Sequence, residues 1–283
     1  MKRRMPISGI VVLTIGALYF LVPVASTVKF SLEQGHAGFG FQAYRQILDD
    51  PQFRHTLWFS VQLALETTVV TMALMVPTVY WVHLRLPKIR PVVEAITILP
   101  FVVPPIVLVV GLFDFFKSFS PDWLLQDFVF SSKFLVAAYV VLSLPFVYRA
   151  LDAGIRAVDI QTLTEAAESL GASRTRTLFR VILPNLREAV LAACLLTFVI
   201  VLGEFTIASI ALYQTFPVYI TTIGSAQAYP AAALTVISVG LTFVAAAVFL
   251  VLGRMGLRKR RQPVLGAAMT GMAGAASTNP GGA

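Results

Sequence analysis

The sequence predicts an all-α polytopic membrane protein with six membrane-spanning helices and one long loop between the fourth and fifth. Of its 283 residues, 57% are hydrophobic and only 13% are charged, about half the charged fraction of a typical soluble domain. The apolar residues gather in stretches long enough to cross about 30 Å of hydrocarbon as helices. A third observation, the distribution of basic residues, orients these helices across the membrane.

The predicted spans are the six apolar runs at 7–28, 57–83, 91–116, 134–150, 189–213 and 231–253. In the third, Pro100, Pro104 and Pro105 predict a kink, because proline removes a backbone donor and clashes with the preceding turn. The fourth is short and contains Pro145, which a bundle tolerates when neighbouring helices satisfy the freed backbone groups.

Basic residues alternate between the two sides of these spans. Seventeen of the 22 Lys and Arg residues lie in the two terminal segments, in the connection at 84–90 and between Arg149 and Arg187. Lys and Arg favour the cytoplasmic side, so both termini are predicted to be cytoplasmic. The first span could instead be a cleaved signal peptide, but its apolar run exceeds a typical signal core and we expect it to be retained.

The formal net charge of +8 does not indicate nucleic-acid binding, because the basic residues flank the spans and no nucleic-acid motif accompanies them. Residues 1–262 are predicted to form one membrane domain. The segment 263–283 is rich in Gly, Ala and Pro without charge or period after Gln262, and is predicted to be disordered. The single cysteine, Cys194, excludes an intramolecular disulfide, and the three histidines form no recognisable metal set.

The loop at 151–188 is too long and too patterned for a passive connection. Its first part predicts a short amphipathic helix, with Asp159 as the N-cap and Gly171 as the C-terminal stop. Four residues fall at i, i+3, i+4 and i+7 on one stripe of that helix: Leu163, Ala166, Ala167 and Leu170. The stripe could dock a partner or pack on the chain's own membrane helices, and periodicity alone does not choose between these.

A second helical piece is predicted to follow, capped by Ser173. Its apolar side consists of Leu178, Phe179, Ile182 and Leu183. Pro184 interrupts this pattern and is predicted to begin the next helix, which leads into the fifth span.

Several residues of this loop match a family motif at every spacing. Glu165, Ala166 and Ala167 are followed after three residues by Gly171, and after nine more by Val181, Ile182, Leu183 and Pro184. This resembles the EAA loop of binding-protein-dependent ABC importer permeases with the type I fold, with Val181 in place of isoleucine. The segments LPFVVPPIV and GEFTIAS are also similar to this family. GEFTIAS followed by TFPVYITTIG is most similar to its polyamine, aminoethylphosphonate and ferric-iron permeases, more than to those for sugars.

The resemblance implies that the segment from Leu163 to Gly171 is a coupling helix in a groove of a separate cytoplasmic ATPase dimer. Ala166 and Ala167 would be contact residues, Gly171 the turn, and Glu165 a polar anchor. The implied coupling residues are completed by Leu163, Leu170, Leu183 and Pro184. The family further implies a bacterial inner-membrane location, a second permease subunit, identical or related, and a periplasmic or lipid-anchored substrate-binding protein.

The sequence itself predicts neither catalysis nor a cofactor. It lacks the G-x-x-x-x-G-K-[ST] phosphate loop, so ATP would be bound by the partner subunit. It also lacks H-E-x-x-H and any acidic cluster suited to a metal. Two other classes stay open, an ATP-independent secondary transporter or channel and a membrane assembly factor, although a secondary transporter has no reason to carry the loop at 159–184.

Four acidic residues lie in or near the spans, where a buried charge is costly enough to indicate function. Glu94 and Asp114 lie near the ends of the third span, where water can solvate them. Glu66 and Glu204 lie deeper and are predicted to line a translocation pathway. For Glu204, beside Gly203 in a possible close helix contact, the alternative is an internally hydrogen-bonded glutamate.

Overall fold

The computed structural model describes residues 7–33, 38–119 and 131–276. Within these ranges the backbone is helical apart from short connections and one isolated bridge between Glu33 and Phe39. Five helices in the described part are long and apolar enough to cross a membrane, or up to six if a sharply bent pair counts as one span. The predicted all-α membrane fold is confirmed, whereas the number of spans is five or six.

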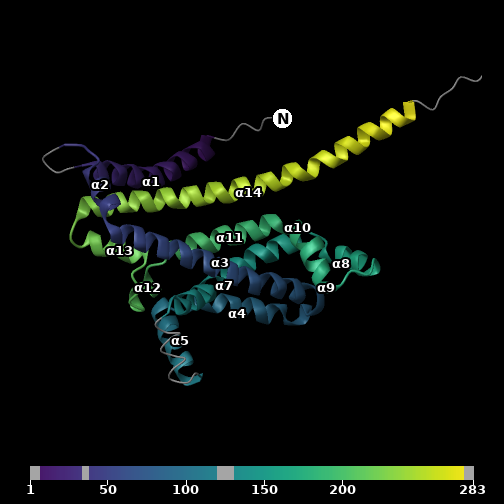
Figure 1. Cartoon of the computed structure of the whole chain (residues 1–283), viewed down its shortest axis with the longest axis horizontal. Helices are drawn as coiled ribbons and strands as arrows, with labels where there is room; N and C mark the ends of the chain where they lie inside the picture. Colours follow the sequence, from purple (N-terminus) through teal and green to yellow (C-terminus); the bar gives the residue numbers. More distant parts are fainter. Residues whose placement is uncertain (1–6, 34–37, 120–130, 277–283) are drawn as a thin grey trace, which may run out of the picture.

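Three helices form the centre of the molecule: α3 (Pro51–Arg85), α7 (Ser132–Arg156) and α11 (Arg187–Leu202). They pack against one another in the bundle of Figure 1. Side chains of α3 enter three successive clusters of buried residues, first at Phe53, then at Leu63 and last at Val79. The apolar core therefore continues along most of the length of the bundle.

A pair of long helices, α1 (Ile7–Leu32) and α14 (Ala228–Ala276), lies side by side along one flank (Figure 1). None of the residues in their most apolar windows is buried, which suits helices that face hydrocarbon. The helix α14 continues to Ala276, past the point at which the sequence predicts disorder. Alanine, the strongest helix former, is the most frequent residue between 263 and 276. Residues 277–283 lie outside the described part.

The third predicted span is broken. The helix α4 (Arg90–Val102) lies along α7 (Figure 1). The helix α5 (Pro105–Phe119) is bent by 111° from the direction of α4. At the break, Val103 is extended, which is the conformation that a following proline favours. The predicted proline kink is confirmed, but it is so sharp that the pair forms either a broken span or a re-entrant loop.

The fifth predicted span is interrupted as well. The helix α11 ends at Leu202, and the short helix α12 (Thr206–Ile210) follows three residues later. Two further short helices, α13 (Phe216–Gly224) and α2 (Gln42–Asp49), pack near the start of α3. The predicted span at 189–213 thus corresponds to the candidate span Arg187–Ile210, whose helix is interrupted after Leu202.

At the other end of the bundle, which we call the α8 end, the chain leaves α7 and returns to α11 through short helices. These are α8 (Ile160–Ser169), α9 (Arg174–Thr177), the π-helix η3 (Leu178–Ile182) and α10 (Leu183–Asn185). Ser173 caps α9 by accepting a hydrogen bond from the Arg176 amide, and Pro184 lies in the first turn of α10. Both features were predicted from the sequence.

Candidate functional site

Asp159 fixes the start of α8. Its carboxylate accepts a hydrogen bond from the Thr162 hydroxyl at 2.7 Å and another from the Thr162 backbone amide at 3.1 Å. The amide bond satisfies a donor that has no partner inside the first turn of the helix. The bond from the Thr162 hydroxyl has the largest effect and, together with the bond from the amide, lowers the pKa of Asp159 below its ordinary value. The predicted N-cap is confirmed.

Gly171 ends the same helix in the left-handed conformation, with a φ of +77°. Its amide donates to the Glu168 carbonyl at 2.9 Å, and the next amide, of Ala172, donates to the Ala167 carbonyl at 3.0 Å. This pair of bonds is the Schellman arrangement, which satisfies the last carbonyls of a helix and favours glycine at this position. Hence α8 has the length that the sequence predicted.

The predicted stripe of α8 is divided between two environments. Ala167 is buried at 8% exposure, together with Ile160 and Thr164, and Leu163 is half-buried against the core of the α8 end. Ala166 is exposed, and Leu170 is 88% exposed. Ala167 packs inward and therefore does not share an exposed face with Ala166 and Leu170, and its contact with an ATPase stays a prediction.

The exposed face of α8 is mostly polar. Glu165 lies on it and accepts a hydrogen bond from the Gln161 side chain at 3.1 Å. Beside it, Ala166 and Leu170 add the apolar part of the face. This outward surface comprises Gln161, Thr162, Glu165, Ala166, Ser169 and Leu170, and we call it the α8 outer face.

Two polar contacts attach α8 to the end of α3. The hydroxyls of Tyr80 and Thr164 lie 3.4 Å apart, and Arg85 forms an ion pair with Glu168 at 3.6 Å. Between these helices lies a polar cavity of about 690 Å³, whose lining includes Arg174. The inner face of α8 is therefore fixed to the membrane helices while the outer face stays open.

The two remaining predicted coupling residues lie at the return to α11. Leu183 is half-buried, and Pro184 is exposed. An apolar groove of about 470 Å³ runs between this region and α3, and Leu183 and Phe179 line it. Leu183 and Pro184 thus shape the α8 end beside α8 but do not belong to its outer face.

Glu204 lies in the break between α11 and α12 and is half-buried. One carboxylate oxygen accepts from the Ile207 amide at 2.9 Å, and the other lies 3.1 Å from that amide and 3.3 Å from the Ala208 amide. The carboxylate also interacts electrostatically with the buried hydroxyl of Tyr139 on α7. Both oxygens of Glu204 are thus engaged in capping α12, which is the internally bonded alternative considered above.

Glu66 is half-buried on α3 and accepts a hydrogen bond from the Gln62 side chain at 2.7 Å. It lines a pocket of about 450 Å³ that also includes Lys133. Glu94 and Asp114 are exposed, as expected for residues near the ends of a span. No group of three or more potential metal ligands occurs among the described residues.

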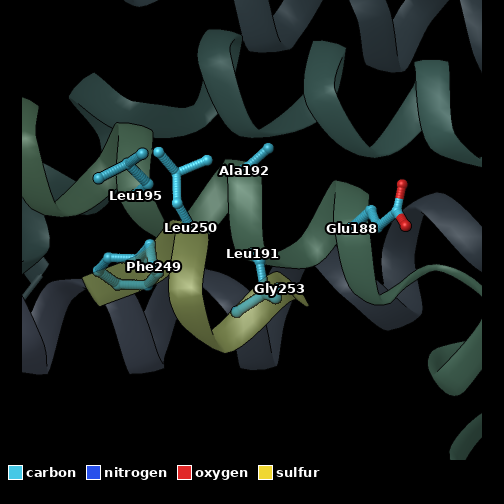
Figure 2. Close-up of a pocket in the computed structure, with 7 residues that line it drawn as sticks. All are labelled: Glu188, Leu191, Ala192, Leu195, Phe249, Leu250 and Gly253. Atoms are coloured by element: carbon cyan, nitrogen blue, oxygen red, sulfur yellow. The ribbon is translucent and has the colours of Figure 1, made fainter. Parts of the chain in front are cut away.

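Another pocket, of about 320 Å³, lies between α11 and α14 (Figure 2). Its walls are apolar, with Leu191, Leu195 and Phe249 among them, and Glu188 is the charged residue among the described side chains that line it. Such a surface offers a polar solute few hydrogen-bond partners, and suits an acyl chain or an apolar side chain better.

The sequence profile of one protein family matches residues 70–258, about two thirds of the chain and all of the α8 end. That family is the binding-protein-dependent transport system inner membrane component. The chain belongs to this family. It is therefore a multi-pass component of a bacterial inner membrane, a transport component and not an enzyme.

Two named relatives illustrate the range of the family. The spermidine/putrescine permease PotB of Escherichia coli K12 is 29% identical over 183 residues, 61% of this chain and 66% of PotB, just under two thirds of its length. The molybdenum permease ModB of the same organism is 30% identical over 191 residues, 64% of this chain and 80% of ModB.

Solved structures agree on the fold. A bacterial ABC transporter that imports the acidic polysaccharide alginate aligns with a TM-score of 0.65 at 16% identity, over 89% of this chain and 94% of its own. The methionine transporter MetNI, in an inward-facing conformation, aligns with a TM-score of 0.58 at 17% identity, over 71% of this chain and 94% of its own. The fold of this permease is thus that of ABC importer permeases.

Proposed function

We propose that this permease forms part of the translocation pathway of an ATP-driven importer and that the α8 outer face docks on a separate ATPase dimer. One observation carries this proposal. The EAA motif lies on a helix that is capped at both ends and fixed on its inner face, yet exposes Ala166 and Leu170 outward. The position of the EAA motif on this face, and not the exposure of Leu170 by itself, makes it the candidate docking surface, because single exposed apolar side chains are common.

The other partners follow from the family to which the chain belongs. A second permease subunit, identical or related, would complete the pathway, and a periplasmic or lipid-anchored binding protein would deliver the substrate. One of the aligned alginate transporter structures contains a periplasmic protein bound to an alginate pentasaccharide. The uncleaved first span, which rests on the length of its apolar run, and the cytoplasmic position of both termini, which rests on the basic flanks, belong to this proposal.

Copurification of the ATPase tests the docking surface. We expect Leu170→Arg and Ala166→Trp to release the ATPase from the tagged permease in membranes, because each puts a bulky or charged group into an apolar contact. Leu212→Arg is a matched control, because Leu212 is 89% exposed and lies in the connection between α12 and α13, away from α8. Full retention of the ATPase by both α8 variants would contradict the proposal.

Transport measurements separate the two alternative classes. Uptake that needs ATP and the binding protein supports the importer. Uptake driven by an ion gradient without ATP would indicate a secondary transporter, and no uptake under either condition a membrane assembly factor.

For the substrate, we propose a small polar solute of the polyamine class. The motif similarity to polyamine permeases and the PotB alignment support it, and aminoethylphosphonate and ferric iron are the other solutes that the motifs favour. The ModB alignment favours an oxyanion of the molybdate type instead. Titrating the binding protein encoded beside this chain with spermidine, putrescine, aminoethylphosphonate, ferric iron and molybdate distinguishes these classes.

A further inference from the structure

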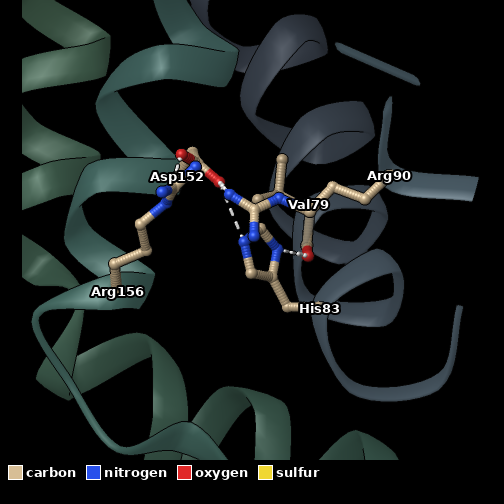
Figure 3. A network of polar contacts seen from close by, with 5 residues as sticks. All are labelled: Val79, His83, Arg90, Asp152 and Arg156. Carbon is tan, nitrogen blue, oxygen red and sulfur yellow. Dashed lines mark hydrogen bonds and ion pairs between the residues drawn. The ribbon is translucent and has the colours of Figure 1, made fainter. Parts of the chain in front are cut away.

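Asp152 joins three helices at the α8 end of the bundle (Figure 3). Its carboxylate lies near the end of α7 and is 14% exposed. One oxygen, Oδ1, lies 2.9 Å from Nε2 of His83 on α3 and 2.9 Å from Nη2 of Arg90, the first residue of α4. The other, Oδ2, forms an ion pair with Nε of Arg156 on α7 itself at 2.8 Å. We call these four residues the Asp152 clamp.

His83 is held from both sides of its ring. Nδ1 lies 2.8 Å from the Val79 carbonyl oxygen, one turn earlier on α3, and Nε2 faces Asp152. The ring therefore lies between a carbonyl oxygen and a carboxylate oxygen, which orients it at the end of α3. The contacts of Arg90 and Arg156 with Asp152 are charge-assisted, the stronger class of hydrogen bond.

The clamp lies where α8 is attached to the membrane helices. Arg156 is the last residue of α7, and α8 begins at Ile160. Ile160 packs in the same buried cluster as Val79 and Leu151, the neighbours of the clamp on α3 and α7. The start of α8 and the clamp are therefore both attached to the last turns of α3 and α7.

The start of α4 is held by packing as well as by the clamp, since Val93 contacts the same buried cluster as Val79 and Leu151. It is joined to α3 through Leu86 and the three-residue helix η2 (Pro87–Ile89), none of which is buried. At its far end α4 meets the 111° break before α5. Arg90 adds a charged tie from the start of α4 to α7, and through α7 to the base of α8.

We propose that Asp152 is a positioning residue for coupling: it makes the ends of α3, α4 and α7 move as one unit with α8. A displacement of α8 is then passed to α4 and its break instead of being absorbed by the exposed η2 connection. This inference rests on the proposed docking of the ATPase on α8. A carboxylate suits the role because it accepts several charged donors at once, which no neutral side chain of its size does.

The test measures the movement of α4 in the intact complex in lipid nanodiscs. Spin labels are placed at Ile96 of α4 and Phe243 of α14, both exposed, after the native Cys194 is replaced by Ser. Distances are recorded without nucleotide and after trapping with ATP and vanadate. We expect a shift in the native protein, loss of the shift in Asp152→Asn and Arg90→Gln, and its recovery in Asp152→Glu, with the ATPase still bound in all four.

Arg90→Gln protects the test against a folding failure, because it releases α4 while His83 still joins α3 to α7. Asp50→Asn is the matched control, since Asp50 also bridges two elements, but at the opposite end of α3. It should keep the full shift. The proposal is overturned if Asp152→Asn and Arg90→Gln keep the shift, if Asp50→Asn loses it equally, or if the native complex binds ATP without any shift. Absence of the ATPase from the native complex would instead refute the proposed function.

Discussion

The carboxylate of Glu204 accepts a hydrogen bond from the backbone amide of Ile207 at 2.9 Å, three residues further along the chain. This bond allows the interrupted fifth span to resume as α12 after Gly203. A negative group at a helix start satisfies free amides and interacts favourably with the positive end of the helix dipole. Any contribution of Glu204 to the pathway therefore acts through the position of α12.

Substitution at Glu204 separates capping from direct contact with the solute. Glu204→Gln keeps an acceptor oxygen and should leave uptake within about twofold of the native protein, since the lost charge contributes roughly 0.3–1 kcal/mol. Glu204→Ala removes the cap and should cost about 1 kcal/mol of stability. Thermal unfolding and uptake measured together check this, and a loss of uptake in Glu204→Gln with unchanged stability would instead place the carboxylate in the pathway.

Tyr219 and Asp50 tie α13 to the start of α3. The Tyr219 hydroxyl donates to one oxygen of Asp50, whose other oxygen caps α3 by accepting from the Gln52 amide at 2.8 Å. Because Tyr219 is buried, Tyr219→Phe should lower the free energy of unfolding by about 1–2 kcal/mol. Tyr229→Phe is the control, because Tyr229 contributes a ring contact with Phe30. Equal unfolding temperatures for the two variants would contradict the assignment.

The same pair predicts a pH dependence. Burial, followed by the hydrogen bond to Asp50 and its charge, raises the pKa of Tyr219 above the ordinary value of 10.0. The bond therefore stabilises the fold fully below pH 10 and is lost as the pH rises through the raised pKa, where the phenolate would repel Asp50. The stability difference between the native protein and Tyr219→Phe should shrink above pH 10. A difference that stays constant across that range would show that the bond does not titrate.

Much of the fold was predictable because the patterns that specify it are local. Apolar runs located the helices, and Asp159, Gly171, Ser173 and Pro184 marked helix ends through capping chemistry that depends on adjacent residues. The breaks were harder to predict. Hydropathy does not register the turn at Glu204, because Gly203 and Phe205 continue an apolar run while the backbone changes direction.

The parts of the site that were missed depend on contacts between distant residues. His83 received no role from its sequence position, and its partner Asp152 is 69 residues away. The one local signal of this contact was Asp152 itself, an acidic residue one helical turn before Arg156 at the end of a span. Likewise, the burial of Ala167 and the exposure of Ala166 depend on how α8 lies on α3, which one amphipathic stripe does not determine.

Gly171 allows a separate prediction for the end of α8. Gly171→Ala adds no clash, since nothing lies within 4 Å of the new methyl group, but it forces alanine into the left-handed region at a cost of about 1 kcal/mol. We expect faster hydrogen exchange in α8 and weaker retention of the ATPase. Gly203→Ala is the control, because its φ of −93° suits any residue and the new methyl group would meet only the Val199 carbonyl at 3.5 Å. Equal rates of hydrogen exchange in α8 for Gly171→Ala and Gly203→Ala would contradict the predicted backbone strain at position 171.

Gly154, and not Gly203, is the glycine that permits a close helix approach. A methyl group added there would lie 2.2 Å from the Ala189 side chain, so α7 and α11 touch almost backbone to backbone. Small residues at such crossings are a common means of helix association in membranes. This crossing lies where the chain leaves for α8 and where it returns, and it therefore closes the base of the α8 end.

Gly154→Ala should push α7 and α11 apart and lower stability by about 1–3 kcal/mol, the usual cost of overpacking. Ala189→Gly alone removes one methyl group and should cost about 1 kcal/mol through helix propensity. The double variant moves the methyl group from one helix to the other, so the two propensity effects cancel and its unfolding temperature should lie close to that of the native protein and well above that of Gly154→Ala. The contact is contradicted if the double variant loses as much stability as the two single variants together. In that case α7 and α11 do not touch at this point, and other residues must hold the base of the α8 end.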